Sequence, residues 1–316
     1  MILVTGATGF VGHAVVQGLL SDNLAQQLVV AVRALDRRWP DRVRPYPVGD
    51  LAGTVDWSGV LGGVRCIIHC AARVHVMAES AADPLGEFRR VNTAATLALA
   101  RAAVLAGVRR FVYVSTIKVN GEETLPGVPF TADDTARPQD PYAISKHEAE
   151  QGLQAIGADA GMEVVIVRPP LVYGPGVGGN FASMMRWLDR GVPLPLASVT
   201  DNRRSLVALD NLVDLLKQCA VKPLAPFTVL LVSDGADLST AALLRRLALA
   251  RGGHARLYPV PPRLLRCMGR ALGQGPALQR LTGSLQIDLS DTQRVLGWSP
   301  PIGVDEGLRR TLGTTA

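Results

Sequence analysis

The most informative chemical pattern in this sequence is a tyrosine followed four residues later by a lysine. Tyr142 and Lys146 lie in PYAISKHEAE, which has helical character, so the two side chains share one face of the helix. Thr116 ends the earlier stretch FVYVST, whose β-branched and aromatic residues are typical of a strand. A phenol, an ammonium group and a hydroxyl can together exchange the proton of a carbonyl/alcohol pair. We therefore predict that Thr116, Tyr142 and Lys146 are the catalytic residues.

The lysine gives this tyrosine a physical means of working near neutral pH. Lowering a tyrosine pKa from about 10 to about 7 requires about 4 kcal/mol. An ammonium group about 4 Å away supplies roughly 4 kcal/mol at an effective dielectric constant of about 20. Such a tyrosine works while a cofactor moves a hydride to or from the same carbon atom. Because a YxxxK spacing alone arises often by chance, the prediction depends on the rest of the chain.

The start of the chain predicts a dinucleotide site. The apolar run MILVT is followed by GATGFVG and then by AVVQGLL, which has helical spacing. This order of strand, glycine loop and helix is typical of nucleotide-binding domains. We expect Gly6 to form the tight turn, Gly9 to let the backbone approach a pyrophosphate and Gly12 to allow close packing. The phosphates would lie at the helix N-terminus, beside Phe10 and Val11.

The second strand, predicted for residues 28–32, ends at a residue that bears on the cofactor. Arg33 stands where NAD-binding proteins place an acidic residue for the ribose 2′-hydroxyl. A guanidinium suits a 2′-phosphate better, so we predict NAD(P) with a preference for NADP; the alternative is that Arg33 is simply exposed. Further cofactor contacts, besides Tyr142 and Lys146, are predicted at Asp50, Leu51, Cys70, Ala71, Ala72, Asn92, Ser115 and Pro169.

Strand-like and helix-like segments alternate along the first half of the chain. Strands are expected over residues 1–5, 28–32, 43–48, 66–70, 111–116 and 163–168, and helices over 83–107 and from 141. This alternation predicts an α/β fold with a Rossmann-type doubly wound parallel sheet. Residues 1–173 would form the NAD(P)-binding domain, to which later segments can return. Residues 174–316 would form a smaller α/β substrate lobe with helices at 181–190, 210–220 and from 238, and strands at 205–209 and 227–232.

Composition limits the classes of function. The net charge is +6, but aromatic residues make up only 5% and the arginines are scattered, so we expect phosphate ligands and no nucleic acid. No apolar run reaches the ~18 residues of a membrane helix and no signal peptide is recognisable, which predicts a cytoplasmic protein without an integral membrane segment. The histidines form no HExxH motif, so no metal site is predicted. Cysteines without a CxxC pair are expected to be buried thiols: Cys66, Cys70, Cys219 and Cys267.

Six stretches taken together resemble one family over nearly the whole chain. In order they are GATGFVG, VSTIKVNGE, PYAISKHEAE, RPPLVYGPG, RRSLVALDN and LGWSP. They are similar to the extended short-chain dehydrogenase/reductases, the NAD-dependent epimerase/dehydratase family. The resemblance implies a catalytic set at Thr116, Tyr142 and Lys146, supported by Asn92. It also implies substrate diphosphate contacts at Arg204 and Asn180, and a homodimer formed through the helices at 83–107 and 141–157.

Within the family, the pattern resembles bacterial enzymes of surface-polysaccharide synthesis that act on UDP-N-acetyl-hexosamines. Many members read VYG where this chain has Val119-Asn120-Gly121, so Asn120 and Thr116 are predicted to contact the sugar. With Arg33 favouring NADPH, we predict a C4 reductase of a UDP-4-keto-6-deoxy-N-acetylhexosamine. The alternatives are a UDP-sugar 4-epimerase acting on UDP-Glc or UDP-GlcNAc, a reductase of non-nucleotide ketones, and a non-catalytic dinucleotide-binding regulator.

Overall fold

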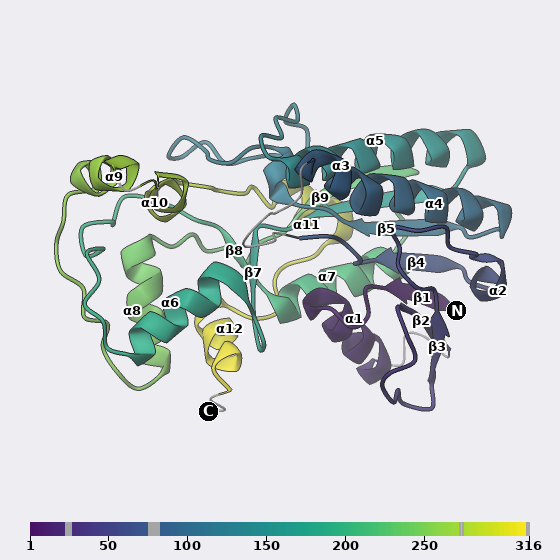
Figure 1. The fold of residues 1–316 in the computed structure, drawn as a ribbon, viewed down its shortest axis with the longest axis horizontal. Coiled ribbons are helices and arrows are strands. Elements are labelled where there is room, and N and C mark those ends of the chain that lie inside the picture. Colours follow the sequence, from purple (N-terminus) through teal and green to yellow (C-terminus); the bar gives the residue numbers. More distant parts are fainter. Residues whose placement is uncertain (23–26, 75–82, 272, 274, 314–316) are drawn as a thin grey trace.

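A parallel sheet of seven strands forms the centre of the molecule, in the order β3-β2-β1-β4-β5-β6-β9 (Figure 1). The computed structural model describes the chain apart from residues 23–26, 75–82, 272, 274 and 314–316. The strands are β1 (Ile2–Thr5), β2 (Leu28–Val32), β3 (Val43–Pro47), β4 (Cys66–His69), β5 (Arg110–Val114), β6 (Glu163–Arg168) and β9 (Phe227–Leu231). The predicted doubly wound α/β fold is confirmed. The strand order reverses between β1 and β4, where such sheets bind their ligands.

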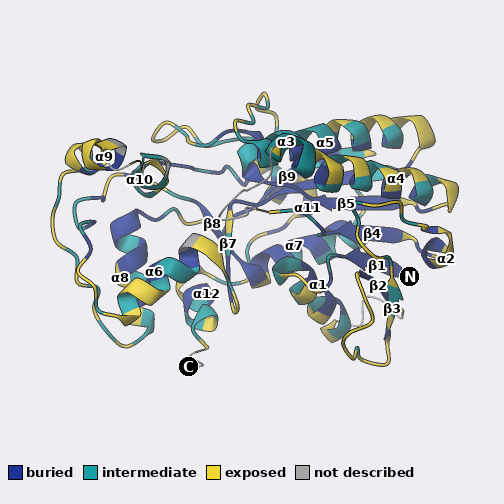
Figure 2. Ribbon diagram, viewed as in Figure 1, coloured by how far each residue is buried: buried dark blue, intermediate teal, exposed yellow. Residues whose placement is uncertain are grey.

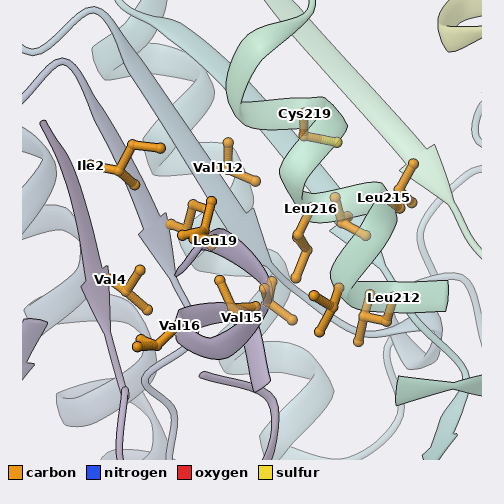
Figure 3. Packing of buried hydrophobic residues seen from close by; sticks show 14 of the residues in the cluster. Ile2, Val4, Val15, Val16, Leu19, Val112, Leu212, Leu215, Leu216 and Cys219 are labelled. Atoms are coloured by element: carbon orange, nitrogen blue, oxygen red, sulfur yellow. The ribbon is translucent and has the colours of Figure 1, made fainter. Parts of the chain in front are cut away.

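Helices cover both faces of this sheet (Figure 1). Helices α1 (Phe10–Ser21), α7 (Leu209–Val221) and α11 (Ser290–Leu296) lie on one face, and α2 (Ser58–Leu61), α4 (Ala95–Leu105) and α5 (Pro141–Ala160) on the other. Figure 3 shows Val4 of β1 packed near Val16 and Leu19 of α1, with Leu212 and Leu216 of α7 closing the layer. Each such side chain contributes about 2 kcal/mol when fully buried. Burial on both faces explains why the strands are nearly continuous apolar runs, dark in Figure 2.

The helix expected over 83–107 is instead divided into three pieces. Helix α3 (Pro84–Phe88) begins at Asp83, whose side chain accepts from the Gly86 N–H at 2.9 Å. A π-helical turn, η1 (Arg89–Ala94), follows and leads into α4. The π-turn carries Asn92, which is fully buried. Wide turns of this kind insert a residue into a helix and frequently occur at functional sites.

The second lobe has its own core and a small sheet. Strands β7 (Leu171–Tyr173) and β8 (Leu206–Ala208) pair in parallel, and the lobe also contains α6 (Gly179–Asp189), α8 (Thr240–Ala250), α9 (Pro262–Ala271), α10 (Gly275–Thr282) and α12 (Val304–Thr311). The segments 210–220 and 227–232 were expected in this lobe, with the allowance that later segments can return to the first domain. Both return: β9 pairs with β6 in the main sheet, and α7 packs in the core beside α1.

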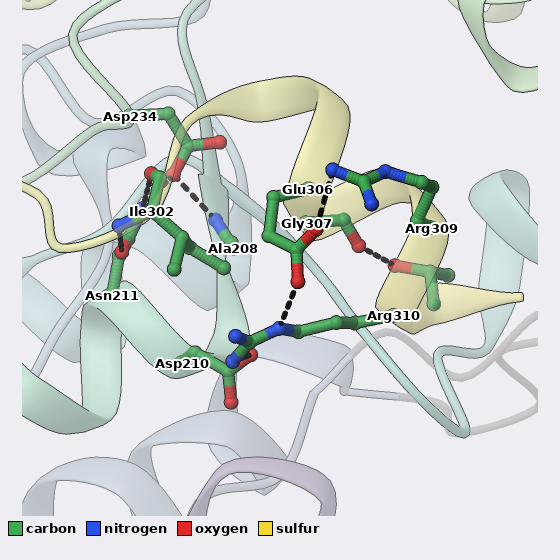
Figure 4. Close-up of polar contacts among 10 residues, drawn as sticks. Ala208, Asp210, Asn211, Asp234, Ile302, Glu306, Gly307, Arg309 and Arg310 are labelled. Atoms are coloured by element: carbon green, nitrogen blue, oxygen red, sulfur yellow. Dashed lines mark hydrogen bonds and ion pairs between the residues drawn. The ribbon is translucent and has the colours of Figure 1, made fainter. Parts of the chain in front are cut away.

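A buried polar cluster ties the last segment of the chain to both lobes (Figure 4). Asp234 accepts from the Ala208 N–H and from Asn211 Nδ2, both at 2.7 Å, and from the Tyr173 hydroxyl at 2.6 Å. Asn211 also donates to the carbonyl of Ile302 at 2.8 Å, just before α12. Burial raises the pKa of Asp234 above its ordinary value, while these donors oppose the rise. The cluster therefore fixes β8, α7 and α12 to one another.

The structure bears on two expectations from composition, the burial of the cysteines and the lack of a membrane helix. Cys66 and Cys219 are buried and Cys70 is half-buried, but Cys267 is exposed on α9, so the prediction of four buried thiols is wrong for Cys267. Helix α9 packs mainly on α10 and leaves most of its surface to solvent (Figure 2). Within the described ranges, no helix has both the length and the apolar character needed to cross a membrane.

Candidate active site

The glycine loop lies tightly against the end of β4. Gly6 has a φ of +66°, and a Cβ atom there would come within 2.6 Å of the Ala71 nitrogen. A Cβ on Gly12 would lie 2.2 Å from the Gly6 carbonyl oxygen, so both positions exclude a side chain. Gly9, the residue before α1, supplies no side-chain cap. The first N–H groups of α1, at Phe10, Val11 and Gly12, therefore form an anion site that fits a dinucleotide pyrophosphate.

A neutral histidine, His69, connects the ends of β1 and β4 beside the glycine loop. The Thr5 hydroxyl lies 2.7 Å from His69 Nδ1, and His69 Nε2 lies 3.0 Å from the Thr96 hydroxyl. Burial, with a smaller effect from Lys146, lowers the pKa of His69 to about 3. Thr5 also accepts from the N–H of Ala71, which is buried, while Ala72 beside it is half-buried. Sequence reasoning assigned no role to His69, and its bonds identify it as a structural support.

The other predicted cofactor residues occupy different settings. Arg33 is exposed at the end of β2. Asp50 is exposed and accepts from the Ala52 N–H at 3.0 Å, whereas Leu51 packs against the core on the α4 face. Pro169 is buried, and its carbonyl accepts from the Ile117 N–H at 2.9 Å. The structure thus leaves Arg33 accessible to a ligand and gives Asp50, Leu51 and Pro169 internal contacts.

The three predicted catalytic residues lie on the loop after β5 and in the first two turns of α5. Thr116 is buried, and its hydroxyl accepts from the Lys118 N–H at 3.3 Å as the cap of the short helix η2 (Ile117–Val119). Tyr142 lies in the first turn of α5, which Asp140 caps, and Lys146 follows one turn later. Lys146 is only 1% exposed, and its Nζ donates to the Val114 carbonyl at 2.8 Å.

Burial is the main influence on the pKa values of Tyr142 and Lys146. Burial lowers the pKa of Lys146 to about 7, and the carboxylate of Glu150 opposes this decrease without cancelling it. Burial raises the pKa of Tyr142 above its ordinary value, and the charge of Asp140 raises it further. Nζ of Lys146 also lies 4.3 Å from the centre of the Tyr113 ring, a cation–π contact that helps retain the charge. Cys70, half-buried beside Lys146, has a pKa raised by burial to about 12, so it stays a thiol.

Asn92 connects the catalytic helix to the loop after β4. Its Oδ1 accepts from the Arg73 N–H at 2.8 Å, and its Nδ2 donates to the Arg73 carbonyl at 3.1 Å and to Ser145 Oγ at 3.0 Å. Ser145 in turn donates to the Tyr142 carbonyl at 2.7 Å. Every polar atom of the Asn92 amide is used, so Asn92 positions α5 while its side chain stays inside the protein.

An ionic network lies beneath the loop that carries Thr116. Glu150 accepts from Ser115 and from Arg168, whose Nη2 lies 2.6 Å from the carboxylate. Arg168 also donates to Asn120 Oδ1 at 2.9 Å, and Asn120 Nδ2 donates to the Thr131 carbonyl at 2.9 Å. Asn120 is 1% exposed. The geometry thus gives Ser115 and Asn120 internal partners and does not favour the sugar contact expected of Asn120.

Arg204 lies in the second lobe, half-buried between two segments. Its Nη1 donates to the Gly283 carbonyl at 3.3 Å. Burial lowers the pKa of Arg204, with Glu122 raising it and the nearby Arg280 of α10 lowering it again. Arginine side chains suit a diphosphate, and the charge of Arg280 acts on Arg204 although the sequence carried no signal for Arg280. Asn180 lies in the first turn of α6, and its side chain is outside the described residues.

No group of three or more histidine, cysteine or acidic residues in the described part of the chain is placed to hold a metal ion. The candidate site combines the uncapped N-terminus of α1, the Thr116, Tyr142 and Lys146 side chains, and Arg204 in the second lobe. Such a combination can bind phosphate groups and transfer a proton.

Comparison with known proteins gives likenesses that extend over both lobes. The NAD dependent epimerase/dehydratase family matches residues 2–225. A UDP-glucose 4-epimerase of Vibrio cholerae is 46% identical over 312 residues, which cover 98% of this chain and 94% of that protein. MoeE5 in complex with UDP-glucuronic acid and NAD is 27% identical, with a TM-score of 0.78 over 99% of this chain and 98% of that one. The UDP-glucose 4-epimerase of Thermus thermophilus in complex with NAD is 25% identical, with a TM-score of 0.76 over 99% of this chain and 98% of that one.

Proposed function

Because this chain belongs to the NAD-dependent epimerase/dehydratase family, we propose that it binds NAD at the glycine loop and acts at C4 of a UDP-sugar. The family membership expected from the sequence motifs is confirmed. One observation supports the proposal: the buried Lys146 donates to the carbonyl of Val114 at the end of β5, two residues before Thr116, and Tyr142 precedes Lys146 by one turn of α5. Strand β5 lies in the same parallel sheet as β1, which leads into the glycine loop. Acid/base and hydride chemistry on one carbon needs these two sites side by side.

Each residue of the set has a distinct part in the chemistry. Tyr142 takes the proton of the C4 hydroxyl and later returns it, and Thr116 hydrogen-bonds the same oxygen. Lys146, with its positive charge, favours the phenolate form of Tyr142. Bound NAD supplies the acceptor and donor of the hydride at C4. The low-polarity surroundings that lower the pKa of Lys146 also strengthen its attraction to a phenolate.

We place 4-epimerisation first among the possible outcomes. The sequence analysis put reduction of a UDP-4-keto sugar first, but the Vibrio cholerae relative, 46% identical over nearly the full chain, is a UDP-glucose 4-epimerase. An epimerase oxidises C4 and then reduces it from the other face, so its cofactor is restored in each cycle. A reductase uses the same residues but consumes a reduced cofactor, which must then leave.

Arg33 supports the reductase as a second candidate. Its exposed guanidinium at the end of β2 suits the 2′-phosphate of NADPH, the reduced cofactor that a reductase would draw on. The solved relatives described above contain NAD, so the preference for NADP remains a prediction. As a reductase, the protein would reduce a UDP-4-keto-6-deoxy-N-acetylhexosamine at C4.

For substrate binding, we propose that Arg204 and Arg280 hold the diphosphate. The supporting observation is that Arg204 is half-buried beside the carbonyl of Gly283, while the charges of Glu122 and Arg280 both act on its pKa. Glu122 also pairs with Lys118 at 3.0 Å, next to the catalytic loop, so this part of the second lobe adjoins the chemistry. The contact of Asn180 with the diphosphate and the homodimer formed through α4 and α5 remain predictions.

The test is to incubate the purified protein with NAD and, separately, UDP-glucose and UDP-N-acetylglucosamine. We expect NMR of the sugar protons to show conversion to the C4 epimer without net formation of reduced cofactor. Consumption of NADPH with a UDP-4-keto-6-deoxy sugar, beside no epimer from either substrate, would favour the reductase. Turnover of a non-nucleotide ketone that Arg204→Ala leaves unchanged would exclude both UDP-sugar activities.

A further inference from the structure

Lys118 bridges the loop after β5 and the start of the catalytic helix. It lies two residues after Thr116, and its backbone N–H donates to the Thr116 hydroxyl at 3.3 Å. Its Nζ lies 2.6 Å from Asp140 Oδ2 and 3.0 Å from Glu122 Oε1. The side chain is 19% exposed, so the ion pair with Asp140 is partly shielded from water.

Asp140 uses its two carboxylate oxygens for different purposes. Oδ1 accepts from the Ala143 N–H at 2.7 Å and caps α5, while Oδ2 pairs with Lys118. Asp140 is also two residues from Tyr142 and is the charged group that opposes ionisation of its phenol. The carboxylate of Asp140, which caps α5, therefore lies close to Tyr142, whose phenol must lose its proton to act as a base.

We propose that Lys118 is a positioning residue of the active site, which fixes the start of α5 through Asp140 and offsets the negative charge of Asp140 beside Tyr142. The proposal rests on the acid/base role proposed above for Tyr142. It assigns to Lys118 an electrostatic task distinct from that of Lys146, because Lys118 pairs directly with Asp140 whereas Lys146 reaches the end of β5.

Other groups face Tyr142 from the elements around it. Tyr113 of β5 lies near enough that, after the larger effect of burial, a charge on Tyr142 raises the Tyr113 pKa, and Lys146 lies on the same helix as Tyr142. Phe88 of α3 meets the Tyr142 ring edge-on at 6.0 Å, and the Arg73 guanidinium lies 5.5 Å from the centre of the Phe88 ring. A lysine charge on the same helix favours the phenolate, whereas burial and the charge of Asp140 oppose it. Substitution of Lys118 changes this balance without removing any of the other charges.

The test follows ionisation of Tyr142 directly, in the full-length protein saturated with NAD and labelled with carbon-13 at the tyrosine Cζ. Tyr142→Phe identifies the signal, which is then titrated by NMR. We expect Lys118→Met to raise the pKa of Tyr142 by about one unit and Lys118→Arg to leave it within about 0.3 unit. Asp140→Asn keeps a helix cap but removes the charge, so it should lower the pKa by about one unit. The double variant Lys118→Met/Asp140→Asn should resemble Asp140→Asn alone.

An unchanged Tyr142 pKa in Lys118→Met, or equal shifts in Lys118→Met and Lys118→Arg, would overturn the proposal. A purely structural role for Lys118 would also fail to give opposite shifts in Lys118→Met and Asp140→Asn. The titration needs no substrate. If these shifts are observed but the protein turns over no UDP-sugar, the proposed substrate class fails, whereas the effect of Lys118 on the pKa of Tyr142 stands.

Discussion

Lys146 is an unusual residue for a protein core, because a charged group with 1% exposure loses almost all of its hydration. One hydrogen bond to the Val114 carbonyl and one contact with the Tyr113 ring replace that hydration only in part. The lowered pKa, about 7, expresses this deficit. Such a residue is retained for chemistry at the expense of stability.

This deficit predicts how stability changes when Lys146 is removed. In the folded protein without cofactor the pKa is lowered to about 7, so between pH 7 and the ordinary lysine pKa the unfolded chain binds more protons and stability rises with pH. We expect Lys146→Met to stabilise the cofactor-free protein by about 1–3 kcal/mol at pH 6, and by less at pH 9.5. Urea unfolding at both pH values measures this. A variant no more stable than the natural protein at pH 6 would contradict it.

Tyr142→Phe removes the hydroxyl that we propose as proton donor and acceptor, while keeping the ring that packs against Phe88. We expect turnover of the UDP-sugar to fall by about 10²–10⁴-fold, the usual contribution of a general acid/base group. Affinity for NAD should change less than about threefold, as measured by titration calorimetry. Tyr258→Phe, at an exposed position in the second lobe, is the matched control and should keep full activity. Comparable losses in both variants would count against the assignment.

Among single residues, the sequence predicted those that interact with residues close to them in the chain. Tyr142 and Lys146 are one helical turn apart, and Glu150, one further turn along, could have been found by the same spacing. The internal role of Asn120 could not be predicted, because its partner Arg168 comes 48 residues later in the chain. Arg280 was not predicted for the same reason, since its charge acts on Arg204 only once the second lobe has folded.

Among the elements, the first turn of α1 contains Gly12, where helix propensity and steric fit have opposite effects on stability. Alanine normally stabilises a helix by about 1 kcal/mol relative to glycine. At Gly12, however, a Cβ atom would lie 2.2 Å from the backbone oxygen of Gly6, which cannot move without distorting the loop. Steric overlap of this kind costs about 1–3 kcal/mol, so the clash outweighs the gain in helix propensity.

Gly12→Ala should therefore lower the free energy of unfolding by about 1–2 kcal/mol and weaken NAD binding at least tenfold. Chemical denaturation and calorimetry measure the two effects. Gly62→Ala is the control, since its φ is −56° and no atom lies within 4 Å of the added Cβ. Wild-type NAD affinity in Gly12→Ala would show that the loop does not hold the cofactor.

Strands of the main sheet were predictable because burial on both faces leaves continuous apolar runs such as LVVAV. The π-turn η1 was not predictable, because its residues RRVNTA have ordinary helical character. Its buried Asn92 bonds to Ser145, which comes 53 residues later in the chain. Strand β7 has only three residues, and its pattern favours a connection between the lobes. Helices α9 and α10 lie in a stretch with few strongly apolar runs, where the sequence predicts no helix.

On the scale of the whole molecule, the chain crosses between lobes more than once. The family resemblance indicated two lobes, but local patterns could not show that β9 pairs with β6 across some 60 residues of sequence. The crossing brings Arg204, near β8, close to Glu122, which follows the catalytic loop. The residues proposed for substrate binding and for catalysis thus come from segments that only the complete fold places together.

Arg204→Ala tests this arrangement through binding alone. Loss of a charged partner for the diphosphate should weaken UDP binding by about 10–100-fold and leave NAD affinity unchanged. Titration calorimetry with UDP in the presence of NAD measures both. Arg245→Ala removes an exposed arginine from α8 and serves as the matched control. Equal UDP affinity in the two variants would exclude Arg204 from the substrate site.

The proposed activity requires that one site removes a hydride from C4 of a UDP-sugar and returns it to the same carbon. The most direct measurement uses UDP-glucose carrying deuterium at C4, incubated with the protein and unlabelled NAD. We predict that NMR and mass spectrometry find UDP-galactose with the deuterium still at C4. Absence of the epimer, or product whose C4 has lost the label, would contradict the proposed activity.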